Sequence, residues 1–289
     1  MNKLCLGTVQ LGMKYGIKNA IGRQPTLEES YKVLQQAVNY GIEYFDTASL
    51  YGNAENVLGS FGLAKRKVNI ISKLPPSGID TEEEVLGYIK ESLKRLQTGY
   101  LDGYLLHNPS DFYNKTIWRG LLHAKENRLV QHIGVSIYDP KDAVRVAADP
   151  DVDYIEIPYN VFDQRLDQTE FFSMVREHGI KVFARSAFLQ GLLLMNKVPD
   201  TLQEGALALK KFQTIVGDYH YTQAEAALLF SYCHPGIDFV VFGVETLDQL
   251  KYNLRIIDKV DGFSACRKQL IGKFDEIPNK IVNPSLWEK

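Results

Sequence analysis

The chain has 289 residues, 45% of them hydrophobic and 24% charged, with a formal net charge of −2. This near-neutral balance gives no reason to expect nucleic acid or an anionic membrane as a partner. The three cysteines show no paired spacing, so neither a disulfide framework nor a metal site is expected, and free thiols are typical of a cytoplasmic protein. No apolar run is long enough for a signal peptide or a membrane span.

Short apolar runs alternate with longer amphipathic runs along the chain. Runs that are apolar at almost every position are typical of parallel strands covered on both faces. The expected strands are residues 4–8, 43–46, 68–73, 101–106, 132–135, 154–157, 181–184 and 239–242.

Helical patterns lie between these strands. Two stripes with helical spacing are Leu27, Tyr31, Leu34 and Val38, which Gly41 can end, and Val85, Ile89, Leu93 and Leu96. Four helices are expected to begin with a capping box, in which a threonine and a glutamate or glutamine three residues later satisfy each other's backbone N–H groups. The boxes are Thr26/Glu29, Thr81/Glu84, Thr222/Glu225 and Thr246/Gln249.

Eight strands alternating with about eight helices predict a parallel sheet with right-handed crossovers. Eight such units favour an α/β fold closed into one (β/α)8 TIM barrel over residues 1–289, with a short tail from about residue 264 to 289. An open Rossmann-like sheet is less favoured, because no G-x-G-x-x-G follows the first strand. The tail is expected to pack on the outer helices or to fold over the barrel mouth.

Proton-handling residues follow three consecutive strands. Asp46 ends the second strand and Tyr51 comes shortly after it. Lys73 ends the third strand, and His107 follows the fourth. In a barrel these strand ends meet at one mouth, where function gathers. Each residue alone has an ordinary interpretation as a helix cap, a surface tyrosine, a rim charge or a turn residue, but the four together predict a catalytic group.

The chemistry that fits these side chains is proton donation to a carbonyl oxygen. A free tyrosine has a pKa of about 10, and a nearby ammonium lowers that value by about 1–3 units. Lys73 can supply the ammonium, and Asp46 can pair with it. Tyr51 then acts as general acid in reduction and as base in oxidation, while His107 orients the substrate. None of these groups supplies hydride, so a cofactor is required, and nicotinamide is the simplest candidate.

The sequence resembles the aldo-keto reductase superfamily, and its opening stretch looks like that of bacterial members. The matching segments are Phe45-Asp46-Thr47-Ala48-Ser49-Leu50-Tyr51-Gly52, Ile71-Ser72-Lys73, Leu105-Leu106-His107, Ile133-Gly134-Val135-Ser136, Pro158-Tyr159-Asn160, Gln190-Gly191-Leu192-Leu193 and Gln249-Leu250-x2-Asn253. The resemblance implies a monomeric (β/α)8 oxidoreductase that uses NADP or NAD and reversibly reduces an aldehyde, ketone or sugar. It also implies that Asp46, Tyr51, Lys73 and His107 are the catalytic tetrad.

The nicotinamide end departs from the family pattern. Ser136 can still hold the nicotinamide carboxamide, but Glu156 stands where the family usually has a glutamine, and a carboxylate cannot donate to the amide oxygen. Arg185 stands where an aromatic residue usually stacks on the nicotinamide ring. Because Glu156 and Arg185 end neighbouring strands with opposite charge, we expect them to pair, either as part of the cofactor site or as an ordinary ion pair at the rim.

The adenine end departs further. The family commonly has a lysine and an arginine that clamp the 2′-phosphate of NADP, and the corresponding positions, aligned on Asn253, are Gly243 and Gln249. Glu245 adds a carboxylate that repels a phosphate and can bond ribose hydroxyls. The residues therefore favour NAD, against a family preference for NADP. Lys251 and Arg255 are alternative phosphate clamps or solvated helix residues. Gln190 and Gly191 are expected to cover the pyrophosphate.

Two other functions remain open from the sequence. One is a Schiff-base lyase that uses Lys73, although a lysine paired with Asp46 stays protonated. The other is a non-catalytic nucleotide-sensing or scaffold protein on the same fold, which the altered nicotinamide end favours and the intact tetrad disfavours. Five aromatic residues are candidates either for the lining of an apolar barrel mouth or for the core. They are Tyr15, Tyr51, Trp118, Tyr138 and Phe188.

Overall fold

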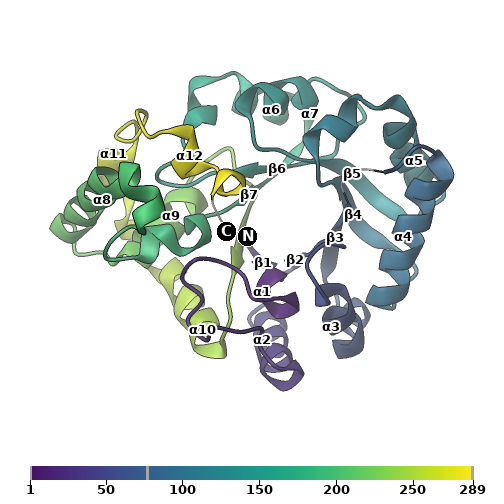
Figure 1. Cartoon of the computed structure of the whole chain (residues 1–289), viewed down its shortest axis with the longest axis horizontal. Coiled ribbons are helices and arrows are strands. Elements are labelled where there is room, and N and C mark those ends of the chain that lie inside the picture. The colour runs from purple at the N-terminus through teal and green to yellow at the C-terminus, as the bar shows by residue number, and fades with distance from the viewer. Residues whose placement is uncertain (1, 76–77, 288–289) are drawn as a thin grey trace.

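The computed structural model describes residues 2–75 and 78–287. Its centre is a closed barrel of parallel strands, each bonded to the next and the last bonded to the first (Figure 1). The strands are β1 (Leu4–Gly7), β2 (Tyr44–Asp46), β3 (Asn69–Leu74), β4 (Leu101–Leu106), β5 (Val130–Ser136), β6 (Tyr154–Pro158), β7 (Lys181–Arg185) and β8 (Phe239–Gly243). All eight expected strands are therefore present, and closure excludes the open Rossmann-like sheet.

Helices surround the barrel (Figure 1). The α-helices are α1 (Val9–Gly12), α2 (Leu27–Asn39), α3 (Ala54–Phe61), α4 (Glu82–Leu96), α5 (Lys115–Glu126), α6 (Pro140–Ala147), α7 (Phe171–His178), α8 (Ala206–Asp218), α9 (Gln223–Tyr232), α10 (Leu247–Ile256), α11 (Ser264–Leu270) and α12 (Asn279–Val282). Short 3₁₀ segments are η1 (Leu63–Lys65), η2 (Pro109–Tyr113), η3 (Arg165–Gln168), η4 (Leu189–Leu194), η5 (Asp200–Gly205), η6 (Ile257–Gly262) and η7 (Pro284–Leu286). None of the described helices has both the length and the apolar character that crossing a membrane requires.

The expected capping boxes begin α2, α4, α9 and α10. The first three are complete, with each threonine and each glutamate bonded to the other's backbone N–H. The fourth is half of a box. Thr246 accepts from the backbone of Gln249, but the Gln249 side chain bonds to Glu245 instead of the threonine. That departure lies beside the pocket described below.

The helical stripes were predicted with different success. The stripe on α4 is confirmed, because all four of its residues are buried. The stripe on α2 was wrong at its first position, since Leu27 is 54% exposed. The buried face of α2 instead includes Val33, Leu34 and Ala37. This face packs toward the barrel, and of the three only Leu34 belongs to the predicted stripe.

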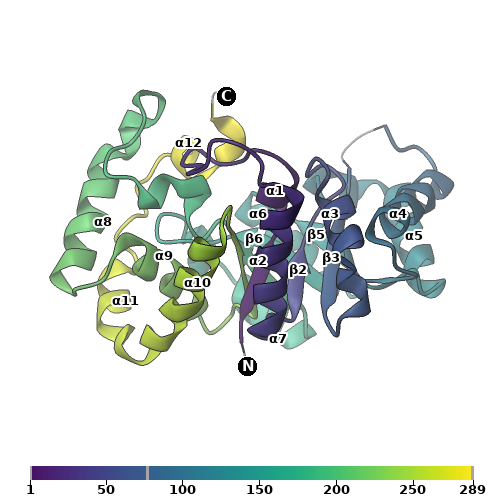
Figure 2. The same cartoon turned by 90° about the horizontal axis from the view of Figure 1, so that it is seen from below.

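The C-terminal tail divides between the two expected positions. Helix α11 packs on the outer helices α8 and α9. Helix α12 contacts η5, and Asn279 accepts a hydrogen bond from Arg165 at 3.0 Å. Figure 2 shows α12 at the end of the barrel where the chain passes from β1 into α1. The pocket described below opens at this same end.

Candidate active site

Strand alternation builds the floor and the mouth of the site. Side chains two residues apart on a strand point to the same side, so each inward residue has another above it. A buried apolar layer inside the barrel includes Tyr44, Ile71, Leu105, Tyr154 and Phe183. Two residues further along the chain from these five stand, in the same order, Asp46, Lys73, His107, Glu156 and Arg185. The sequence spacing therefore places one layer of ionisable groups on an apolar floor.

Lys73 lies at the centre of this layer. Its side chain has no exposed surface, and its ammonium contacts Asp46 Oδ1, with Thr47 O at 3.2 Å. The expected pair between Lys73 and Asp46 is thus present in the structure. A second carboxylate, Glu156, approaches from β6 on the far side of the barrel, with Oε2 at 3.2 Å from Lys73 Nζ. Burial alone would lower the pKa of Lys73, but the two carboxylates outweigh burial and hold the pKa above its usual range.

Tyr51 lies in the turn between β2 and α3, and two glycines set its position. A side chain on Gly12 would collide with the backbone carbonyl of Tyr51, and one on Gly52 would collide with Gly12 O. Gly52 also has φ +56°, which favours glycine. Asn53 N donates to Gly12 O at 3.2 Å. Close backbone packing between α1 and this turn therefore fixes where the Tyr51 ring enters the barrel mouth.

The acidity of Tyr51 differs from the sequence expectation. Lys73 Nζ lies 5.4 Å from the centre of the Tyr51 ring and lowers the pKa of the phenol, as predicted. Burial is the larger effect, however, and together with the charge of Asp46 it raises the pKa above its usual value. The predicted net lowering of the Tyr51 pKa was therefore wrong. Burial destabilises the phenolate by more than the buried and already paired Lys73 ammonium stabilises it.

His107 faces Tyr51 across the mouth. The two rings lie 5.8 Å apart, edge to face. Burial, with the positive charge of Lys73, lowers the pKa of His107 to about 4, so the imidazole is neutral at neutral pH. Within residues 2–75 and 78–287 its buried Nδ1 has no hydrogen-bond partner. A neutral ring next to the tyrosine can donate one hydrogen bond to a carbonyl oxygen.

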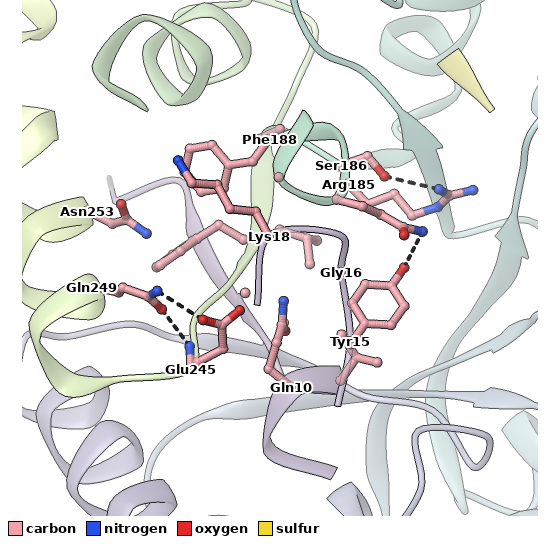
Figure 3. Close-up of a pocket in the computed structure, with 18 of the residues that line it drawn as sticks. Gln10, Tyr15, Gly16, Lys18, Arg185, Ser186, Phe188, Glu245, Gln249 and Asn253 are labelled. Atoms are coloured by element: carbon pink, nitrogen blue, oxygen red, sulfur yellow. Dashed lines mark hydrogen bonds between the residues drawn. The ribbon is translucent and has the colours of Figure 1, made fainter. Parts of the chain in front are cut away.

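A pocket of about 720 Å³ opens above this layer and extends away from Tyr51 and His107 along the barrel mouth. That volume is typical of a site for a cofactor or a small ligand. All nine residues predicted to bind the cofactor line it, namely Ser136, Glu156, Arg185, Gln190, Gly191, Gly243, Glu245, Gln249 and Asn253. Figure 3 shows Glu245, Gln249 and Asn253 on one side of the pocket and Tyr15 and Arg185 on the other.

The nicotinamide end contains the expected pair. Arg185 Nε lies 3.4 Å from Glu156 Oε1, and Ser136 Oγ donates to the same oxygen at 2.7 Å. The guanidinium also donates to Ile137 O at 2.9 Å and lies 4.1 Å from the centre of the Tyr138 ring. Arg185 is thus held as a flat cation on an aromatic ring, and both oxygens of Glu156 are already engaged.

At the other end of the pocket, the Glu245 side chain joins the loop after α1 to helix α10. Its Oε2 accepts from Ala20 N at 2.9 Å and from Gln249 Nε2 at 3.0 Å, while its own N–H donates to Gln249 Oε1 at 2.7 Å. Ile17 N donates to Gln190 O at 3.1 Å. The loop after α1 is therefore tied to both walls of the pocket, and the carboxylate that holds it faces the pocket.

Several lining residues were missed by the sequence reasoning, including Gln10, Lys18 and Ser186. Lys18 lies between the two walls in Figure 3, and its ammonium donates to Leu194 O. The only signal available was position, since Gln10 and Lys18 both follow the first strand, where barrel loops carry function. Nothing in residue type separates them from surface residues.

Three residues that the sequence offered as candidates for the site do not line the pocket. Trp118 is buried on α5 against Phe112, at 5.0 Å between ring centres, and does not line the pocket. Lys251 and Arg255 are exposed on α10 and lie outside the lining, which favours the interpretation as solvated helix residues. By contrast, Tyr15, Tyr51, Tyr138 and Phe188 do line the mouth.

The pocket fits an extended nucleotide cofactor. Gln10 Oε1 is buried, without a hydrogen-bond partner among the described residues, next to Gly243. A side chain on Gly243 would collide with the Gln10 carboxamide, so the groove is kept open by the absence of one there. An unsatisfied acceptor in a glycine-lined groove suits a polar ligand that brings its own donors.

Fold and site together define an oxidoreductase of the TIM-barrel type. A sequence model of the Aldo/keto reductase family matches residues 3–264, and the chain belongs to this family. The family is generally NAD(P)H-dependent and acts on small carbonyl compounds. The same match disfavours the Schiff-base lyase, as does the burial of Lys73 below the pocket, where it is held as an ammonium without a free electron pair.

Relatives support the assignment at different levels. The uncharacterized oxidoreductase YqkF of Bacillus subtilis is 26% identical over 282 residues, covering 88% of this chain and 90% of the relative. Glyoxal reductase of the same organism is 31% identical over 185 residues, covering 61% and 64%. The solved structure of aldo-keto reductase AKR11C1 from Bacillus halodurans (holo form) has a TM-score of 0.74 at 21% identity and covers 95% of both chains. At that identity the likeness concerns the fold.

Proposed function

We propose that this enzyme reversibly reduces an aldehyde, ketone or sugar carbonyl to an alcohol, with Tyr51 as general acid. The observation that carries the proposal is the juxtaposition of Tyr51 and a neutral His107 at one end of the pocket, directly above the buried Lys73–Asp46 pair. A bound nicotinamide supplies the hydride. The chain itself supplies the proton and orients the carbonyl.

Tyr51 is the proton donor because its phenol lines the pocket beside His107, lies close to the Lys73 ammonium and remains protonated. The raised pKa of Tyr51 keeps the phenol neutral at physiological pH. Lys73 provides the opposing field, which stabilises the phenolate once the proton has left. In the oxidation of an alcohol the same phenolate takes the proton back.

His107 is the orienting group. With its pKa near 4 it is a neutral imidazole, and it donates one N–H to the carbonyl oxygen that receives the proton from Tyr51. Its edge-to-face position beside Tyr51 supports two donors that converge on a single oxygen. A neutral donor does not compete with Tyr51 as an acid.

The cofactor would lie along the pocket from Ser136 to Asn253. Ser136 and Arg185 would hold the nicotinamide end, and Gln190 and Gly191 the pyrophosphate. Gly243, Glu245, Gln249 and Asn253 would surround the adenosine. At this end the carboxylate of Glu245, which bonds Ala20 N and Gln249, would repel a 2′-phosphate. We therefore propose a preference for NAD(H) over NADP(H).

A panel of small aldehydes, ketones and sugars, run with NADH and with NADPH, tests this function. We expect turnover of at least one carbonyl, faster with NADH at equal concentration, and loss of turnover in Tyr51→Phe with unchanged cofactor binding. Cofactor binding measured by nicotinamide fluorescence, without turnover of any member of the panel, would instead favour the nucleotide-sensing or scaffold function.

A further inference from the structure

The ammonium of Lys73 is fully committed within its own layer. A lysine ammonium has three donors. Here it contacts Asp46 Oδ1, Thr47 O at 3.2 Å and Glu156 Oε2 at 3.2 Å. The three side chains are almost completely buried, with exposed fractions of 0%, 5% and 2% for Lys73, Asp46 and Glu156. The active site therefore has two carboxylates around one cation, where the expected tetrad has one.

Glu156 is the better-supported carboxylate of the two. Its second oxygen accepts from Ser136 Oγ at 2.7 Å and lies 3.4 Å from Arg185 Nε. Burial would raise the pKa of Glu156, but Lys73, Arg185 and Ser136 outweigh it and keep the pKa below the usual range. For Asp46, burial and the charge of Glu156 outweigh Lys73, and the pKa lies above the usual range. Glu156 is thus held as a second anionic partner that faces Lys73 beside Asp46.

The engagement of Glu156 limits what else it can do. Both of its oxygens face residues of the chain, toward Lys73 on one side and toward Ser136 and Arg185 on the other. A glutamine there would keep the contact with Ser136 and lose the charge. A glutamate at this position therefore differs from a glutamine mainly by placing a negative charge beside Lys73, and less by how it binds a ligand amide.

We propose that Glu156 is a positioning residue that shares with Asp46 the task of holding Lys73 as a fixed ammonium beneath Tyr51. It acts through Lys73 and touches neither the substrate nor the reacting atoms. This inference rests on the proposed function for its kinetic consequences, whereas the charge state of Lys73 is independent of any substrate.

Because Asp46 and Glu156 both contact the Lys73 ammonium, each carboxylate can partly replace the other in keeping Lys73 charged. With Asp46→Asn or Glu156→Gln alone, Lys73 keeps one anionic partner, and we expect kcat to fall about tenfold in each. With both changes the buried ammonium has no anion, and we expect a loss at least about tenfold greater than the product of the single losses. If Glu156 acts only on the cofactor, the double loss equals that product.

The pH profile separates this role from a merely structural one. The charge of Glu156 raises the pKa of Tyr51, so Glu156→Gln lowers it. Reduction needs the protonated phenol, and its rate therefore falls at a lower pH in Glu156→Gln than in the unmodified enzyme. Glu55→Gln is the matched control, because Glu55 is a buried carboxylate paired with Arg95 at 2.6 Å outside the pocket. It should leave the pH profile in place.

The deciding experiment is a ¹⁵N NMR titration of the Lys73 ammonium, assigned with Lys73→Met, in the full chain and the three variants. We expect a charged Lys73 at pH 8 in both single variants and a neutral amine only in the double variant. A neutral Lys73 in Asp46→Asn with Glu156 intact would overturn the inference. So would a double variant that is folded and still has a charged Lys73. Because no substrate is needed, failure of the carbonyl panel with this NMR result would reject the proposed function alone.

Discussion

The two ends of the pocket are built in different ways. At the catalytic end, charges are buried and paired with each other, and Lys73 has no exposed side-chain surface. At the nucleotide end, the carboxylate of Glu245 faces the pocket and clasps a loop through Ala20 N. Changes at the first end are therefore expected to alter chemistry and stability together. Changes at the second end are expected to alter ligand choice and leave the fold intact.

The largest expected effect is at the catalytic end. Tyr51→Phe removes the donated proton but keeps the ring that packs beside His107. We expect kcat for carbonyl reduction to fall about 10³-fold, within the range for general acid catalysis, with little change in cofactor affinity. Steady-state kinetics and fluorescence titration measure the two quantities. Near-normal kcat would show that the proton comes from elsewhere.

Removal of the buried cation tests whether this end also stabilises the fold. Lys73→Met leaves Asp46 and Glu156 as buried carboxylates without their shared ammonium. We expect the free energy of unfolding to drop by about 3–5 kcal/mol, as measured by urea denaturation. Arg95→Met is the control, because it breaks the pair between a partly exposed Arg95 and Glu55. An equal loss in both variants would mean that burial of the Lys73 cluster has no special role.

Acid titration gives an intermediate effect. Burial lowers the pKa of His107 to about 4, whereas an unfolded histidine has a pKa of about 6.5. The unfolded chain therefore binds a proton first, so the contribution of neutral His107 to stability is present above pH 6.5 and is lost as pH falls toward 4. We expect a loss of about 2–3 kcal/mol over this interval that His107→Gln abolishes. An NMR pKa near 6.5 for His107 would contradict this.

The nucleotide end should respond in ligand choice only. Glu245→Gln removes the charge that would face a bound 2′-phosphate and keeps an acceptor for Ala20 N. We expect the Kd for NADPH to fall about tenfold, while the Kd for NADH and the unfolding free energy change little. Asp248→Asn, on α10 outside the pocket lining, is the control. Equal changes for both nucleotides would remove the basis for NAD preference.

The smallest effect is expected at Arg185, beside the buried cluster at the catalytic end. Arg185→Ala leaves Glu156 without one of its cations but with Lys73 still at 3.2 Å. We expect cofactor affinity to weaken about fivefold, roughly 1 kcal/mol, in calorimetric titration. Unchanged affinity would make the pair an ordinary ion pair at the rim.

The fold and the grouping of the proposed catalytic residues followed from local pattern. Eight apolar runs predicted eight strands, and alternation along β2, β3 and β6 places Asp46, Lys73 and Glu156 above an apolar layer. Contacts across the barrel did not follow. The pairing of Glu156 with Arg185 was predicted because their strands are neighbours, whereas its pairing with Lys73 joins β6 to β3 and depends on the diameter of the closed barrel.

Quantities that depend on burial were also beyond the sequence. The sign of the Tyr51 pKa shift was predicted from Lys73 alone, but desolvation by the surrounding chain is the larger effect. Lys18 was missed because its place in the pocket depends on a loop held by Gln190 and Glu245, which lie far away in the chain. Residue type and spacing carry no record of such long-range contacts.

The central claim is that hydride from a nicotinamide and a proton from Tyr51 reach one carbonyl group. Reduced cofactor deuterated on the transferring face of C4 tests it directly, with mass spectrometry of the alcohol product. We predict that the wild-type enzyme places deuterium on the former carbonyl carbon and that Tyr51→Phe, with cofactor bound, yields almost no labelled alcohol. Labelled product formed by Tyr51→Phe at the wild-type rate would contradict the account.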